Sequence, residues 1–264
     1  MASDFGQYDL VIVGGTAGAV SVAISSKRSG IDKVRILEPS GAVVFADLVA
    51  ENQLDVGYGE TLESISAGPD GLVVTTNLHR YLTVGCLVAQ RDQDPAWVPP
   101  VPVPQSDRVC VDELSADLTD RDVLVVGYSD HAVELLAEGA LRGGRMVLAA
   151  GGMDPAKLSP AGEHMLRRLE RERRATVLYR SVPDQISLVK GEPVAHFSDR
   201  RTPDLVFDEV TFASMRTRPP TASLGITDEA LETGKIIFLG RPDEDPSVPT
   251  APCLLYTSPS PRDS

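Results

Sequence analysis

Blocks of apolar residues in the first forty positions predict a strand, a helix and a second strand. An apolar run, Leu10 to Val13, predicts the first strand. Val20, Ala23 and Ile24 then recur at the spacing of one helix face, and Val34 to Leu37 predicts the next strand. The order is that of the unit that opens many nucleotide-binding domains.

A glycine-rich turn joins this strand to this helix, and its residues are Gly14, Gly15, Thr16, Ala17 and Gly18. Glycines let backbone N–H groups approach a pyrophosphate, and a helix N-terminus favours an anion. Glu38 ends the second strand, 20 residues after Gly18, where a carboxylate accepts hydrogen bonds from a ribose. The unit therefore predicts dinucleotide binding. The GxGxxG spacing of such turns is irregular here: either Val13 stands in place of the first glycine, or the turn is one residue short. The alternative to dinucleotide binding is an ordinary connection between a strand and a helix.

A second unit of the same kind follows 113 residues later (127 − 14 = 113). It has a strand over 122–126, a helix over 133–141 and a strand over 146–150. Its turn consists of Gly127, Tyr128, Ser129, Asp130, His131 and Ala132. Two such turns in one chain are far more specific than either alone.

The remaining patterns complete an α/β prediction with three layers. Residues 61–65 and 72–76 predict a hairpin, and 82–89 a buried strand. Five prolines in residues 94–104 predict the connection that leaves the first domain. A charged helix with a solvated, ion-paired face is predicted over 164–174. Short strands of a meander are predicted over 177–179, 185–189, 193–197 and 205–207, with a further strand over 210–213.

Composition narrows the class of protein. The chain has 264 residues and a net charge of −13, which disfavours nucleic acid and anionic lipid as partners. No apolar run reaches the length of a membrane helix, and the first residues lack the pattern of a signal peptide, so a cytoplasmic location is the expectation. Arginine outnumbers lysine, as in GC-rich bacterial genomes. Cys86, Cys110 and Cys253 are too scattered for a disulfide framework or a zinc site, and no metal is expected.

Four stretches, taken in order, resemble the pyridine nucleotide-disulfide oxidoreductase superfamily, which includes thioredoxin reductases and dihydrolipoamide dehydrogenases. YDLVIVGGTAG with Glu38 resembles the FAD fingerprint, and CLVAQRDQDPAWVPPVP lies where the family has its crossover. VLVVGYSDHAVE resembles the NAD(P)H turn, and VTFASMRTRPPTASLGI resembles the return to the FAD domain. The resemblance implies two Rossmann-like dinucleotide-binding domains of three-layer ββα type, with the NAD(P) domain inserted in the FAD domain.

The resemblance also implies roles for individual residues. FAD contacts fall on Gly14, Gly15, Thr16, Ala17, Gly18 and Glu38, and NAD(P)H contacts on Gly127, Ser129, Asp130, His131 and Ala132. Glu134 matches the family's acid near the place where nicotinamide meets flavin, and an exposed carboxylate of a first helical turn is the alternative. The resemblance leaves a homodimer open for the full-length protein.

The sequence also departs from the family. Gln90-Arg91 stands where the crossover has Thr-Gly, and neither of the family's cysteine pairs, CxxxxC and CxxC, is present. An internal redox disulfide is therefore not expected. Residues 149–154, after the second nucleotide strand, do not distinguish NAD from NADP.

These patterns predict the domain boundaries. Residues 1–104 form the first part of an FAD domain, 105–218 an NAD(P) domain, and 219–252 a return to the FAD domain. Residues 253–264, CLLYTSPSPRDS, resemble an adapter-derived artefact, and the stretch before them, GKIIFLGRPDEDPSVPTAP, resembles the family's approach to its next flavin motif, which would begin where this artefact starts. The sequence thus predicts a C-terminally truncated chain.

The predicted function is that of an FAD-dependent oxidoreductase that passes hydride from NAD(P)H to FAD and on to an unidentified acceptor. A nucleotide-binding module without turnover, such as a decayed paralogue, is the alternative that the irregular first turn favours. A dehydrogenase that uses only nicotinamide is a third hypothesis, which predicts one bound nucleotide per chain.

Overall fold

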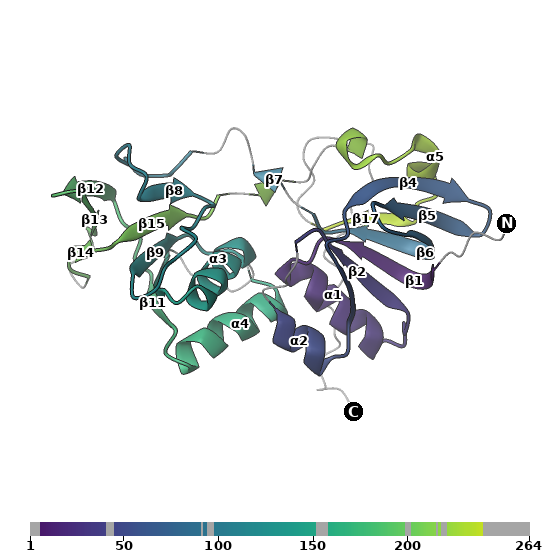
Figure 1. The fold of residues 1–264 in the computed structure, drawn as a ribbon, viewed down its shortest axis with the longest axis horizontal. Coiled ribbons are helices and arrows are strands. Elements are labelled where there is room, and N and C mark those ends of the chain that lie inside the picture. The colour runs from purple at the N-terminus through teal and green to yellow at the C-terminus, as the bar shows by residue number, and fades with distance from the viewer. Residues whose placement is uncertain are drawn as a thin grey trace, which may run out of the picture.

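The computed structural model describes residues 6–40, 45–90, 92–93, 98–151, 158–198, 202–214, 216–217 and 221–239. Its two largest sheets are a mixed sheet of seven strands and a parallel sheet of five, and helices packed on each of them meet in the middle of the molecule (Figure 1). Several predictions fall outside these ranges: part of the proline-rich connection, part of 149–154, the end of the return stretch and the predicted artefact.

The first sheet has seven strands in the order β3-β2-β1-β6-β5-β4, with β17 also paired to β6. Strands β3, β2, β1, β6 and β17 run parallel, whereas β4, β5 and β6 form an antiparallel meander. The elements are β1 (Gly6–Val13), α1 (Ala17–Arg28), β2 (Val34–Glu38), α2 (Ala46–Glu51), β3 (Asp55–Tyr58), β4 (Leu62–Gly68), β5 (Gly71–Thr76), β6 (Arg80–Val88) and β17 (Ile236–Phe238).

Three layers make up this first unit. Helices α1 and α2 cover one face of the parallel strands, with Ile12, Val20 and Leu48 in the core between them. On the other face, Val11 and Leu37 share a second core with the meander and with α5 (Asp228–Glu232). The alternation of buried residues along β1 explains both cores, because neighbouring side chains point to opposite faces.

The second sheet has five parallel strands in the order β11-β10-β9-β15-β8. Helices α3 and α4 cover one face, and a small antiparallel sheet of β12, β13 and β14 lies beyond the other (Figure 1). The elements are β8 (Val109–Val111), β9 (Asp122–Val126), α3 (Asp130–Leu141), β10 (Arg145–Ala150), α4 (Pro160–Arg171), β11 (Ala175–Tyr179), β12 (Gln185–Val189), β13 (Glu192–His196), β14 (Leu205–Val206) and β15 (Glu209–Phe212).

The second unit is inserted in the first. The chain leaves the first sheet after β6, builds the second sheet, and returns as β17 beside residues 86–88 of β6. The outgoing β7 (Asp92–Gln93) and the returning β16 (Arg216–Thr217) pair with each other. The predicted α/β fold, with one Rossmann-like unit inserted in another, is confirmed.

One part of the prediction is wrong. Residues 177–179 belong to β11, which is parallel to β10 rather than part of a meander. The strand predicted over 210–213 is β15, which is parallel to β9 and β8. Only β12, β13 and β14 form the antiparallel meander. Short apolar runs do not reveal strand direction, since pairing partners far along the chain decide it.

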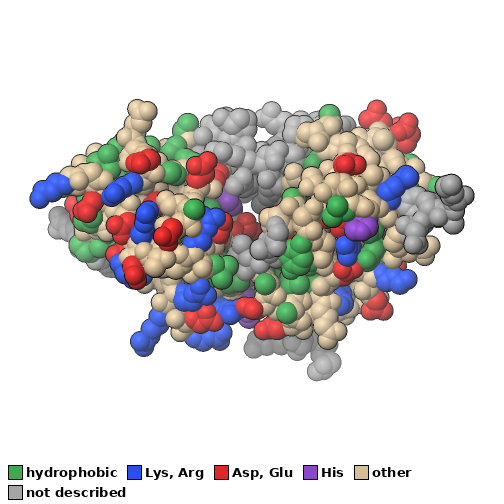
Figure 2. Space-filling model, in the orientation of Figure 1, with side chains coloured by type: hydrophobic (Ala, Val, Ile, Leu, Met, Phe, Trp, Pro, Cys, Tyr) green, Lys and Arg blue, Asp and Glu red, His purple; other side chains and the backbone are tan. Residues whose placement is uncertain are grey.

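The charged helix begins earlier than its charge pattern predicts. Ser159 caps α4 by accepting a hydrogen bond from the Gly162 N–H, and Pro160 occupies the first turn, where proline is favoured. Arg167 pairs with Glu163 at 2.5 Å, as expected for a solvated face. Figure 2 shows basic and acidic side chains interspersed over this unit.

The helices of the two units share one apolar core. Ala17 and Val20 of α1, Leu136 of α3 and Met165 of α4 are all buried in it. The Ser21 Oγ also accepts a hydrogen bond from the Ala161 N–H at 3.0 Å. This packing places the N-terminal end of α1 beside α3.

Candidate dinucleotide-binding site

The first glycine turn is tightly built against the neighbouring strand. Gly14 has φ +98°, and a Cβ atom there would lie 2.9 Å from the backbone nitrogen of Gln90. The Gly14 N–H donates to the Leu37 carbonyl oxygen at 2.8 Å. Both the backbone conformation and the close approach require glycine.

Glu38 reaches back to this turn. Its Oε2 accepts a hydrogen bond from the Gly15 N–H at 2.7 Å, and its Oε1 accepts one from the Ser40 N–H at 2.8 Å. A Cβ atom on Gly15 would lie 2.1 Å from Oε2. Glu38 thus contacts the glycine turn directly, a contact that the sequence pattern does not predict.

The start of α1 holds a carboxylate from the second unit. Thr16 caps the helix, with its side chain accepting a hydrogen bond from the Ala19 N–H. The Ala17 N–H donates to the Glu134 Oε1 at 2.8 Å, although the two residues are 117 positions apart. Two carboxylates therefore occupy backbone donors of the turn, which shows that the turn binds anionic oxygen.

Gly18 lies against the segment that returns from the second unit. A Cβ atom there would lie 2.5 Å from the Leu239 Cδ2, the end of a side chain of the returning segment. The lack of a side chain at Gly18 thus leaves room for the segment that follows β17.

The second glycine turn begins α3. Gly127 has φ +142°, and its N–H donates to the Ala149 carbonyl oxygen at 3.2 Å. Ser129 caps the helix and accepts a hydrogen bond from the Ala132 N–H. The turn thus joins strand and helix as predicted.

Two of its predicted ligand residues contact other parts of the protein. The Asp130 Oδ1 accepts a hydrogen bond from the Ser159 N–H at 2.8 Å, which fixes the start of α4. The His131 Nε2 lies 2.7 Å from the Asp112 Oδ1, and its Nδ1 lies 3.6 Å from the Glu134 Oε2. His131 therefore links Asp112 to the carboxylate that reaches the first turn.

Asp112 and Ser214 belong to this cluster, and the sequence patterns did not indicate them. The Asp112 carboxylate accepts hydrogen bonds from the N–H and the hydroxyl of Ser214. Burial raises the pKa of Asp112, but the hydrogen bonds from His131 and Ser214 outweigh it and lower the pKa to about 2. Both residues follow strands at the carboxyl edge of the second sheet, where ligands of such folds bind. The three-residue β8 was too short to give this signal.

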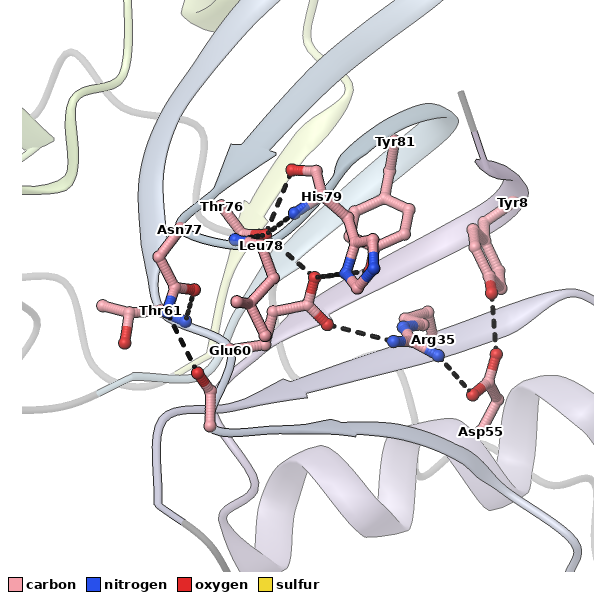
Figure 3. Close-up of polar contacts among 11 residues, drawn as sticks. Tyr8, Arg35, Asp55, Glu60, Thr61, Thr76, Asn77, Leu78, His79 and Tyr81 are labelled. Carbon is pink, nitrogen blue, oxygen red and sulfur yellow. Dashed lines mark hydrogen bonds and ion pairs between the residues drawn. The ribbon is translucent and has the colours of Figure 1, made fainter. Parts of the chain in front are cut away.

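A second polar network fixes the segment that follows Glu38 (Figure 3). Glu60 is buried, and its backbone N–H donates to the Glu38 carbonyl oxygen at 3.1 Å. Its carboxylate accepts hydrogen bonds from Thr76 at 2.8 Å and from the Arg35 Nη2 at 3.0 Å. The Tyr81 hydroxyl also donates to it.

The acid of this network, Glu60, is buried and pairs with Arg35. Burial by itself raises the pKa of Glu60, but the hydrogen bonds from Tyr81, Thr76 and Arg35 outweigh it and lower the pKa. Arg35 also pairs with the half-exposed Asp55 at 2.5 Å. The network joins strands β2, β3, β5 and β6 on the side of the sheet away from α1.

The described residues contain no group of three His, Cys, Asp or Glu side chains that could hold a metal ion. Within the same residues, no helix has the length and hydropathy needed to cross a membrane.

No protein-family model matches the chain, and no curated protein matches it in sequence. Among solved structures, it is similar to the bacillithiol disulfide reductase Bdr (YpdA) of Staphylococcus aureus, with 15% identity, 83% of this chain and 79% of that chain covered, and a TM-score of 0.39. It is also similar to the thioredoxin reductase of Streptococcus pyogenes, with 17% identity, 80% and 78% covered, and a TM-score of 0.38.

The thioredoxin reductase of T. acidophilum gives 14% identity, 81% and 79% covered, and a TM-score of 0.41.

Proposed function

We propose that the chain binds FAD at the first glycine turn and NAD(P)H at the second, and acts as an NAD(P)H:acceptor oxidoreductase. The observation that carries the proposal is the hydrogen bond between Ala17 of one Rossmann-like unit and Glu134 of the other. It places the start of α1 within reach of α3, as transfer between two dinucleotides requires.

The donors of the first turn fit the pyrophosphate of a dinucleotide. The N–H groups of Gly15 and Ala17 already bind carboxylate oxygens, and phosphate oxygens offer the same acceptor chemistry. Glu38 would turn from Gly15 to the ribose hydroxyls. When bound, FAD supplies an isoalloxazine ring that accepts hydride from NAD(P)H.

The second turn is assigned to NAD(P)H. Gly127 allows close backbone approach, and Ser129 and Ala132 form the first turn of α3, where a pyrophosphate is favoured. We assign 105–218 to this domain, and 1–104 with 219–252 to the FAD domain.

The acceptor lies outside the chain in this proposal. Cys86 is fully buried, and burial raises its pKa to about 12, which keeps the thiol protonated at neutral pH. Cys110 lies in the other sheet, on β8. A quinone, a ferredoxin-like carrier or an external disulfide would receive the electrons instead.

The same carboxylates favour one alternative, a dinucleotide-binding module without turnover. If Glu38 and Glu134 hold Gly15 and Ala17 permanently, the first turn does not accept FAD. The second turn would then bind nicotinamide dinucleotide alone.

The visible spectrum of the purified chain separates the two functions. The protein is incubated with FAD, freed of unbound flavin, and recorded before and after anaerobic NADH and NADPH. Flavin bands that bleach with one nucleotide would support the reductase and name its donor. A colourless protein that still binds NADH would refute it in favour of the module.

A further inference from the structure

Three polar side chains on the small sheet of β12, β13 and β14 are joined in one line. The Ser187 Oγ lies 2.7 Å from the His196 Nε2, and the His196 Nδ1 lies 2.7 Å from the Asp204 Oδ2. Each ring nitrogen thus has the partner that it has in serine hydrolases, where the carboxylate orients the imidazole and the imidazole takes the serine proton.

The register of the strands explains how residues from three segments meet. Gln185 lies opposite His196, and Ser187 lies opposite Val194, which is itself opposite Val206. Residues that lie opposite each other share a face. Asp204 is two residues before Val206, so its side chain lies on the same face of the small sheet as Ser187 and Val194. Ile186 and Ala195, on the other face, are buried against the second sheet.

The three residues are accessible and lie far from the glycine turns. The side chains of His196 and Asp204 are 34% and 56% exposed, and Ser187 is half-buried. The small sheet is at the end of the second unit that is farthest from the first (Figure 1). The predicted oxidoreductase chemistry does not use these residues.

We propose that Ser187, His196 and Asp204 form a hydrolytic site for esters with short apolar acyl groups. The acyl preference comes from Val189 and Val206, which share the face of Ser187 and are 52% and 56% exposed. Val189 lies two residues after Ser187 on β12, and Val206 lies across β13 from Ser187 on the same face.

A backbone donor is available for the oxyanion. The Ile186 N–H points away from β13, since it donates to the Pro102 carbonyl oxygen at 3.1 Å. Backbone groups alternate along a strand, so the Leu188 N–H points to the same edge. Leu188 immediately follows Ser187. Its N–H stabilises the negative oxygen that forms when the serine attacks the ester carbonyl.

The reaction balances without a further reagent. The Ser187 Oγ attacks the ester carbonyl carbon while its proton passes to the His196 Nε2. The C–O bond to the alcohol breaks, and the alcohol leaves with that proton. Water then attacks the acyl carbon while one of its protons passes to the His196 Nε2. The bond between this carbon and the Ser187 Oγ breaks, and His196 returns the proton to Oγ, which leaves one carboxylic acid and free serine.

Hydrolysis of p-nitrophenyl acetate and p-nitrophenyl butyrate by the full chain tests the site, without added FAD or NAD(P)H. Ser187→Ala should lower kcat/KM by about 100-fold or more, since general-base activation contributes at least that factor. Ser198→Ala is the matched control, because Ser198 is a nearby exposed serine that bonds Asp184. Asp204→Asn should also lower the rate and alter its pH profile.

Labelling gives a second readout that does not depend on turnover. A fluorophosphonate should add covalently to Ser187, as located by mass spectrometry, and fail to add after His196→Gln. Circular dichroism confirms that each variant is folded. Equal hydrolysis by Ser187→Ala and the unaltered chain, or a fluorophosphonate that does not modify Ser187, would overturn the proposal.

Discussion

The carboxylate of Glu134, on the second Rossmann-like unit, accepts a hydrogen bond from the Ala17 N–H at the start of α1, 2.8 Å away. His131 lies 3.6 Å from the other oxygen of Glu134 and 2.7 Å from Asp112. A line of polar groups thus runs from the carboxyl edge of the second sheet to the glycine turn of the first.

Glu134→Gln should strengthen the binding of FAD to the first turn. A carboxylate competes for the Ala17 N–H more strongly than an amide does, because a charge-assisted hydrogen bond exceeds a neutral one by about 1 kcal/mol. Affinity should rise by about fivefold, as measured by fluorescence titration. The control is Glu138→Gln, because Glu138 lies on the same helix but pairs with Arg142. This variant should leave the affinity for FAD unchanged. Equal affinity for FAD in the unaltered protein and in both variants would mean that Glu134 does not compete with FAD for the Ala17 N–H.

The glycine turns were predictable because their signal is local. In each case an apolar run ends in glycine and a helical pattern follows. The structure adds that Thr16 and Ser129 cap the two helices. The contact between Ala17 and Glu134 was not predictable, since it depends on how two distant units pack. The Glu60 network was missed for the same reason, because Arg35, Glu60 and Tyr81 come from separate elements.

Gly14→Ala should cost about 3 kcal/mol of unfolding free energy. The positive φ of Gly14 strains any side chain, and a Cβ atom would press on the backbone of residue 90. Gly30→Ala is the control, since Gly30 has φ +87° but open space around it. Strain alone should cost it about 1 kcal/mol. Urea unfolding measures the loss in both variants, and equal losses would show that the contact with the backbone of Gln90 is unimportant.

Asp112 should make the stability of the protein depend on acid pH. Its pKa is lowered to about 2 in the folded protein, so its stabilising contribution is present above pH 4 and is lost as the pH falls towards 2. Lowering the pKa of Asp112 from its ordinary value of 3.8 corresponds to about 2 kcal/mol of stability.

Urea unfolding between pH 2 and pH 6 measures this contribution. Asp112→Asn should be less stable than the unaltered protein at pH 6, and the difference should shrink as the pH falls. A constant difference across this range would show that the ionisation of Asp112 does not contribute.

Glu60→Gln should destabilise the protein although no predicted ligand residue changes. The Glu60 side chain is only 1% exposed, and its charge is balanced by Arg35 and by hydrogen bonds from Thr76 and Tyr81. Removing one partner of a buried pair leaves the other charge poorly compensated, which costs about 3 kcal/mol. Urea unfolding measures the loss.

The control for this change is Glu63→Gln, because Glu63 is exposed on the neighbouring β4. Its unfolding free energy should change by less than about 0.5 kcal/mol. Asp55 remains as a second partner of Arg35, so the loss in Glu60→Gln should grow when Asp55→Asn is added, by more than Asp55→Asn costs alone. Strictly additive losses would mean that Arg35 does not couple the two acids, and that Glu60 stabilises the fold through Thr76 and Tyr81.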